Sequence, residues 1–252
     1  MKKKKNIGRI VNGILGLLFP PVCVHCRKML DFRSTDALCT ECKKLWGSEL
    51  ISVCRDCYMP VEKCECTPAG ASKNLKKLFH AVEYDPEVES VSRSVILSAK
   101  NGEQKFLNEL ISSTLENTLK THMPRRKNLV ITYLPRSSKN VDKTGVDQAL
   151  TAAKELSKRT GIPFVSAVTR TGGKEQKRLN MEQRKENAYS SYAVNAKAIP
   201  EVAKKTVVIC DDVVTTGASM SAAADIIRTM GASTVIGLSL GRAYKKAPKN
   251  KE

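Results

Sequence analysis

VVICDDVVTTGAS, residues 207–219, is the stretch that decides the fold. Its first four residues are apolar and mostly β-branched, as expected for a central strand of a parallel sheet that is buried on both faces. The acidic pair Asp211 and Asp212 follows at once, and small and hydroxylated residues then lead into a predicted helix. Ligands of open α/β sheets bind beyond the carboxyl ends of the strands. The stretch therefore predicts an α/β fold with a ligand site at residues 211–219.

The loop after the acidic pair has the chemistry of a phosphate site. Backbone N–H groups at a helix start bind anions, and the hydroxyls of Thr215, Thr216 and Ser219 add further donors. Gly217 lets the backbone approach a ligand closely. The two carboxylates would repel a phosphate, so we expect them to face ribose hydroxyls or a metal ion. Cys210, on the strand before them, is predicted to be a small buried core residue.

The order of apolar strand, acidic pair, Thr-Thr-Gly and helix resembles the phosphoribosyl pyrophosphate (PRPP) motif of type I phosphoribosyltransferases. The resemblance implies that Asp211 and Asp212 hold the ribose 2′- and 3′-hydroxyls and that the following loop surrounds the 5′-phosphate. The PRPP-binding residues expected from it are Asp211, Asp212, Val214, Thr215, Thr216, Gly217, Ala218, Ser219, Pro135 and Arg136.

Strand and helix patterns alternate through the rest of the chain from about residue 75. We expect helices at 86–100, 103–120, 147–160 and 219–230, and strands at 128–134, 164–168, 206–210 and 234–240. The polar, basic stretch 170–187 is expected to be a mobile loop in its first half. This alternation predicts a mostly parallel sheet with helices on both faces.

Eight of the nine cysteines lie between residues 23 and 66, as closely spaced pairs. Two C-x-x-C turns complete a tetrahedral zinc site, so four pairs predict two structural zinc ions without an open position for a catalytic water. Consecutive pairing is the simplest arrangement, and a cross-brace of alternate pairs is the alternative. The predicted ligands are Cys23, Cys26, Cys39, Cys42, Cys54, Cys57, Cys64 and Cys66. Thiolate ligands indicate a reducing, cytoplasmic location.

The chain is strongly basic, with a formal net charge of +18. Its two ends carry much of this charge, and the remaining body is still basic, which favours anionic partners such as phosphates or nucleic acid. The apolar run 7–19 is too short for a spanning helix, which needs roughly 20 residues, so no transmembrane segment is predicted. A signal peptide and a lead-in lying on a membrane surface are the alternatives, and no small-x-small cleavage site follows the run.

Zinc knuckles followed by a PRPP motif resemble the ComF family, proteins associated with DNA uptake in competence and similar to amidophosphoribosyltransferases. Matching positions are Tyr133, Leu134, Pro135 and Arg136 in a loop that receives pyrophosphate in type I enzymes, and further Lys100, Gly102, Arg170, Gln176, Arg184 and Asn187. The family's Arg-Gly-Phe-Asn-Gln is Thr-Gly-Val-Asp-Gln here, at residues 144–148. The expected segments are a lead-in at 1–19, a zinc-ribbon module at 20–75, a phosphoribosyltransferase-like domain at 76–242 and a basic tail at 243–252.

The activity that this resemblance implies is displacement of pyrophosphate from ribose C1 by an acceptor that the sequence does not specify. Mg²⁺ would neutralise part of the negative charge on pyrophosphate. A loop carrying Lys177 would neutralise more of that charge and exclude water. The expected catalytic residues are Asp211, Asp212, Arg136, Lys174 and Arg178. The alternative is a retired transferase fold that serves as a scaffold for single-stranded DNA or a competence helicase. The aromatic content of 5% argues against extensive base stacking.

Overall fold

The computed structural model describes residues 20–54, 57–64, 66, 71–100, 105–123, 127–136, 145–171 and 189–243. The helices are α2 (Thr40–Glu49), α3 (Val91–Lys100), α4 (Lys105–His122), α6 (Gln148–Thr160), α8 (Ile199–Val202) and α9 (Ala218–Thr229), with short 3-10 turns η1 (Val61–Lys63) and η3 (Ala196–Ala198). The strands are β1 (Leu75–Glu83), β2 (Leu129–Tyr133), β3 (Val168–Arg170), β4 (Tyr192–Val194), β5 (Thr206–Val214) and β6 (Thr234–Arg242).

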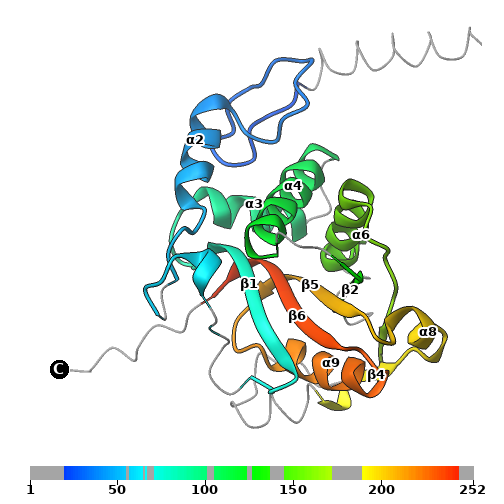
Figure 1. Ribbon diagram of the computed structural model, residues 1–252. Helices are drawn as coiled ribbons and strands as arrows, with labels where there is room; N and C mark the ends of the chain where they lie inside the picture. Colours follow the sequence, from blue (N-terminus) through cyan, green and yellow to red (C-terminus); the bar gives the residue numbers. More distant parts are fainter. Residues whose placement is uncertain are drawn as a thin grey trace, which may run out of the picture.

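Four strands form a sheet in the order β1-β6-β5-β2, and each neighbouring pair is parallel. Helices α3, α4 and α6 share a core with one face of this sheet, and α9 packs against the other face (Figure 1). Strands β3 and β4 form a separate antiparallel ribbon. The expectation of a parallel sheet flanked by helices, as in type I phosphoribosyltransferases, is confirmed.

The apolar residues of β5 explain its central place, because Val207–Cys210 are all fully buried between the two helical layers. One glycine lets the layers come close together. A Cβ atom built on Gly237 of β6 would lie 2.0 Å from the Met220 sulfur of α9 and 2.6 Å from Leu78 Cδ1. Glycine at this position therefore allows α9, the helix that follows the predicted phosphate loop, to pack directly on the sheet.

Helix α6 agrees with the prediction to within one residue. Asp147 accepts a hydrogen bond from the Leu150 amide at 3.2 Å, and Gly161 ends the helix in the left-handed conformation at φ 69°. The helix predicted at 86–100 begins only at Val91, where the carboxylate of Glu49 accepts from the Val91 and Ser92 amides at 2.8 and 2.7 Å.

Two strand predictions were wrong. No strand forms at 164–167 in the described chain, where Phe164 makes one isolated parallel bridge to Ile131, and β3 starts at Val168. Strand β5 runs four residues further than predicted, through the acidic pair to Val214, because β6 continues beside it as far as Arg242. Strand β1 was not predicted as a strand at all.

The cysteine-rich part shares its hydrophobic core with the sheet domain. Val24, Leu38 and Trp46 are buried in the same cluster as Phe79 of β1 and residues of α3 and α4. The chain after α2 also runs along β1, where the Ile51 amide donates to the Ala81 carbonyl at 3.0 Å. None of the helices among the described residues is long and apolar enough to cross a membrane.

Candidate functional site: a phosphate loop and two cysteine clusters

The predicted phosphate loop lies at the carboxyl end of β5, where it leads into α9. Gly217 has φ 72°, a left-handed conformation that favours glycine, and it places the first amides of α9 at the loop. The loop encloses a cavity of about 150 Å³. Its lining comprises Asp211, Val213, Val214, Thr215, Thr216, Gly217, Ala218, Ser219 and Met220. The structure thus brings seven of the predicted PRPP-binding residues together around one pocket.

The two aspartates have different surroundings, because successive residues of a strand point to opposite faces. Asp211 lines the phosphate-loop cavity, whereas Asp212 is absent from its lining. Burial of the Asp211 carboxyl, together with the neighbouring Asp212 charge, raises the pKa of Asp211 well above its usual range. A cation or a hydroxyl donor at this carboxylate would relieve that cost.

Asp212 faces two basic side chains from other elements. Its Oδ2 accepts a hydrogen bond from Arg136 Nη2 at 2.6 Å, and Lys100 Nζ, at the end of α3, lies 3.9 Å from the same atom. These contacts leave Arg136 beside the acidic pair. The structure therefore joins Arg136, in the loop after β2, to the end of β5.

The stretch in which the chain departs from the ComF pattern has a local structural role here. Asp147 Oδ2 accepts from the Arg136 amide at 3.1 Å, while its Oδ1 caps α6. Gln148 donates to the Lys100 and Val146 carbonyls, each at 3.2 Å. Asp147 thus holds the backbone of the loop that carries Arg136.

Several predicted residues lie outside the described part of the chain: Gly102, Lys174, Gln176, Lys177, Arg178, Arg184 and Asn187. Sequence reasoning missed one neighbour of the site, Tyr192, which is only 7% exposed. Its side chain faces Arg170, whose Nη1 donates to the Tyr192 hydroxyl at 3.1 Å. The family pattern pointed to Arg170, but no sequence signal distinguished Tyr192 from other tyrosines.

The eight N-terminal cysteines form two groups of four, and the Sγ atoms of each group lie within 4.8 Å of one another. The groups are consecutive in sequence, Cys23–Cys42 and Cys54–Cys66, as in the simplest predicted pairing. The Cys26–Cys39 and Cys57–Cys64 sulfurs are each 3.7 Å apart. Four sulfurs at about 2.3 Å from a central zinc ion would be separated by roughly that distance. Both groups could therefore hold a zinc ion.

The two clusters begin with knuckles of the same shape. Arg27 and Tyr58, each following the second cysteine of its pair, have positive φ values of 61° and 56°. Their amides donate back to the Cys23 and Cys54 carbonyls at 3.0 and 2.8 Å. His25, which lies within the first knuckle, has its Nδ1 3.0 Å from the Ser94 hydroxyl of α3.

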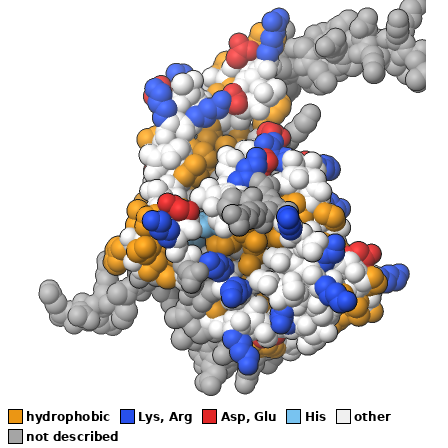
Figure 2. Space-filling view, in the orientation of Figure 1, with side chains coloured by type: hydrophobic (Ala, Val, Ile, Leu, Met, Phe, Trp, Pro, Cys, Tyr) orange, Lys and Arg blue, Asp and Glu red, His pale blue; other side chains and the backbone are white. Residues whose placement is uncertain are grey.

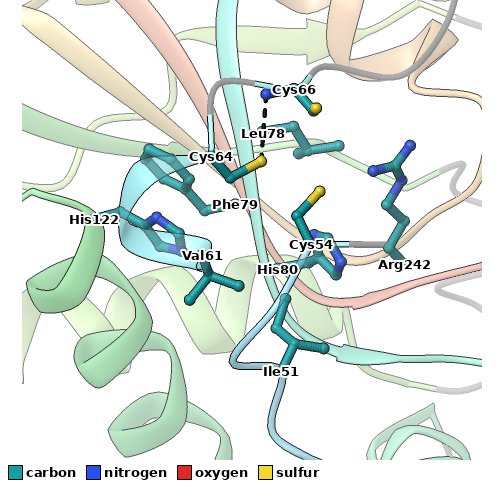
Figure 3. A pocket seen from close by; sticks show the side chains of 10 residues that line it. All are labelled: Ile51, Cys54, Val61, Cys64, Cys66, Leu78, Phe79, His80, His122 and Arg242. Carbon is teal, nitrogen blue, oxygen red and sulfur yellow. Dashed lines mark hydrogen bonds between the residues drawn. The ribbon is translucent and has the colours of Figure 1, made fainter. Parts of the chain in front are cut away.

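Figure 3 shows how the second cluster meets the sheet. Cys54, Cys64 and Cys66 line a small pocket with side chains of β1, α4 and β6, among them Phe79, His80, His122 and Arg242. Its volume of about 20 Å³ is enough for one water at most. Burial raises the pKa of the Cys64 thiol to about 12, assisted by the neighbouring cysteines. The cluster thus lies between the cysteine-rich part and the sheet.

A protein-family model matches the C-terminal part of the chain. Residues 141–250 match the family model described as phosphoribosyl transferase domain. No curated protein matches the chain.

Among solved structures, the chain is similar to glutamine PRPP amidotransferase from B. subtilis (17% identity, 61% of this chain, 28% of that one, TM-score 0.34). It is also similar to adenine phosphoribosyltransferases from Thermoanaerobacter pseudethanolicus (18%, 63% and 86%, 0.36) and Saccharomyces cerevisiae (17%, 56% and 70%, 0.36). The chain covers only 28% of the length of that amidotransferase and 26% of that of a similar structure described as the allosteric regulatory enzyme of purine biosynthesis.

Proposed function

We propose that this protein, whose residues 141–250 match a phosphoribosyl transferase domain, binds PRPP and transfers its phosphoribosyl group to an acceptor, releasing pyrophosphate. One observation carries the proposal. The loop 214–219 forms a pocket at the end of β5, with Asp211 in its wall and Arg136 held beside the acidic pair by Asp212. A 5′-phosphate fits the loop, ribose hydroxyls fit the carboxylates, and pyrophosphate fits the Arg136 side of the site.

The proposed roles follow from the charges. Loop amides and hydroxyls bind the 5′-phosphate, Asp211 accepts from the ribose, and Asp212 orients Arg136 toward the leaving pyrophosphate. Arg136 stabilises the negative charge that develops as the C1–oxygen bond breaks. The crowded carboxylates fit Mg²⁺, which when bound with PRPP would neutralise pyrophosphate oxygens. We propose that the positively charged side chains of Lys174 and Arg178 also bind pyrophosphate.

Within this domain family we propose the ComF family, with a role in DNA uptake in the cytoplasm. The support is the pair of four-cysteine clusters ahead of the domain, which we propose to hold two structural zinc ions. The domain segments proposed are 1–19, 20–75, 76–242 and 243–252.

PRPP binding is the direct test of this proposal. Titration of the zinc-loaded full chain with PRPP in a calorimeter should show saturable binding that strengthens with Mg²⁺, because the metal reduces repulsion between pyrophosphate and the acidic pair. A screen of amines and nucleobases should then find an acceptor for which pyrophosphate is released. A folded, zinc-loaded protein that binds neither PRPP nor ribose 5-phosphate would contradict the proposal.

Single-stranded DNA is a second candidate ligand, favoured by the net charge of +18. Figure 2 shows Lys and Arg side chains spread over both the cysteine-rich part and the sheet domain. We expect binding to fall steeply between 50 and 200 mM salt, by roughly 300-fold if about six phosphates are contacted. Fluorescence anisotropy with a labelled oligonucleotide at both salt concentrations measures this. Affinity that does not change with salt would rule out an electrostatic interface.

A further inference from the structure

The ribbon of β3 and β4 places an arginine and a tyrosine directly opposite each other. Arg170 pairs with Tyr192 in the antiparallel register. The guanidinium lies 5.2 Å from the centre of the tyrosine ring, and its Nη1 donates to the tyrosine hydroxyl at 3.1 Å. The two side chains therefore form one stacked and hydrogen-bonded unit.

Tyr192 connects this unit to the phosphate loop. It is 7% exposed and is buried in the same hydrophobic cluster as Val214 of the loop and Met220 of α9. Burial, and after it the Asp211 charge, raises the pKa of Tyr192. Tyr192 is thus a neighbour both of the loop proposed for the 5′-phosphate and of the carboxylate proposed for the ribose.

Arg170 connects the same unit to the other half of the site. Its Nη1 also approaches the Pro135 carbonyl, at 3.5 Å, in the loop proposed for pyrophosphate. Pro135 precedes Arg136, whose guanidinium bonds to Asp212. The Arg170–Tyr192 unit therefore contacts segments that follow β2 and β5, two strands separated by more than 70 residues of chain.

We propose that Arg170 and Tyr192 are a positioning pair, which holds the Pro135–Arg136 loop and the 214–219 loop at the separation that a PRPP molecule spans. The inference rests on the proposed function, because it concerns a ligand with phosphate groups at both ends. A fixed separation lowers the entropy lost when one ligand binds both loops, whereas a ligand with a single phosphate end gains little from it.

The test compares three ligands in the zinc-loaded full chain by calorimetry: PRPP, ribose 5-phosphate and inorganic pyrophosphate, each with Mg²⁺. Tyr192→Phe keeps the ring under the guanidinium and removes only the hydroxyl. We expect it to weaken PRPP binding roughly tenfold, about the value of one net hydrogen bond, and to change the two smaller ligands less than about threefold. Tyr189→Phe is the matched control, because that nearby hydroxyl donates to Asp225 on α9 and should leave all three affinities unchanged.

Arg170→Lys tests whether the pair acts through the shape of the guanidinium group or only through its positive charge. Lysine keeps the positive charge but lacks the planar group that stacks on the ring and reaches the Pro135 carbonyl, so PRPP binding should weaken as in Arg170→Ala. Full rescue by lysine, or an equal loss for all three ligands in Tyr192→Phe, would overturn the inference while leaving the proposed function intact. Failure of the unmodified protein to bind any of the three ligands would instead refute the proposed function, and the inference with it.

Discussion

The double variant Asp211→Asn, Asp212→Asn should lose most of its affinity for PRPP and the dependence of that affinity on Mg²⁺. Asparagine keeps the size of each side chain but removes the charge that attracts hydroxyl donors and a cation, and it also releases Arg136 from Asp212. Where turnover is measured, the loss of such an electrostatic contact should lower the rate by roughly 10²–10³-fold. Calorimetry with PRPP, with and without Mg²⁺, measures the affinity.

Asp36→Asn is the control for this variant, because Asp36 pairs with Lys43 on the surface of the cysteine-rich part and should not affect PRPP. Ribose 5-phosphate should still bind the double variant weakly through the intact loop. Unchanged PRPP affinity in a folded double variant would mean that the acidic pair is structural and that the proposed site is wrong.

Replacing Asp211 by Asn should raise the stability of the fold at high pH, although it weakens PRPP binding. Because the folded-state pKa of Asp211 is raised, its protonated form favours the fold below the ordinary aspartate pKa, and this contribution is lost as pH rises through the raised value. Asp211→Asn is neutral at every pH. Its thermal midpoint should therefore exceed that of the unmodified protein at high pH, and the difference should shrink as pH falls toward the ordinary aspartate range.

Removal of metal should have the second large effect. Purified full chain should contain about two zinc ions, and chelation should lower the midpoint of thermal unfolding by more than about 10 °C, because structural zinc supplies folding free energy directly. The loss should reach the sheet domain, since Trp46 and Leu38 of the cysteine-rich part share a core with β1 and α3. Calorimetric scans with and without chelator, together with metal analysis, measure both quantities.

Single cysteine variants supply the controls. Cys64→Ser should reduce the metal content to about one ion, whereas Cys210→Ala should keep two, because Cys210 lies in the sheet away from both clusters. Fewer than one zinc per chain in freshly reduced protein would contradict the assignment.

The parts of the structure that the sequence predicted well are those whose signals are local. An apolar strand, an acidic pair and a glycine-containing loop follow one another within residues 207–219, and the structure forms one pocket from them. The pairing of the cysteines was likewise suggested by short spacings.

Features that depend on distant partners were missed. Strand β1 has the sequence LKKLFHAVE, whose lysines and histidine hide its strand character, and it is a strand because β6 pairs with it over its whole length. The predicted strand at Phe164 has suitable residues but only a single bridge to β2. Tyr192 could not be recognised because Arg170, which donates to its hydroxyl, and Val214 and Met220, which share its buried cluster, lie more than 20 residues away in sequence.

The passage of the chain beside β1 has a consequence for solubility. Among the described residues, β1 has one strand neighbour in the sheet order β1-β6-β5-β2, and its other side meets Leu50 and Ile51 of the cysteine-rich part. An uncovered edge strand offers unpaired backbone groups to other chains and promotes aggregation. The cysteine-rich part therefore covers this edge where it meets β1, and a shortened chain that begins at β1 would tend to self-associate even where its phosphate loop is intact.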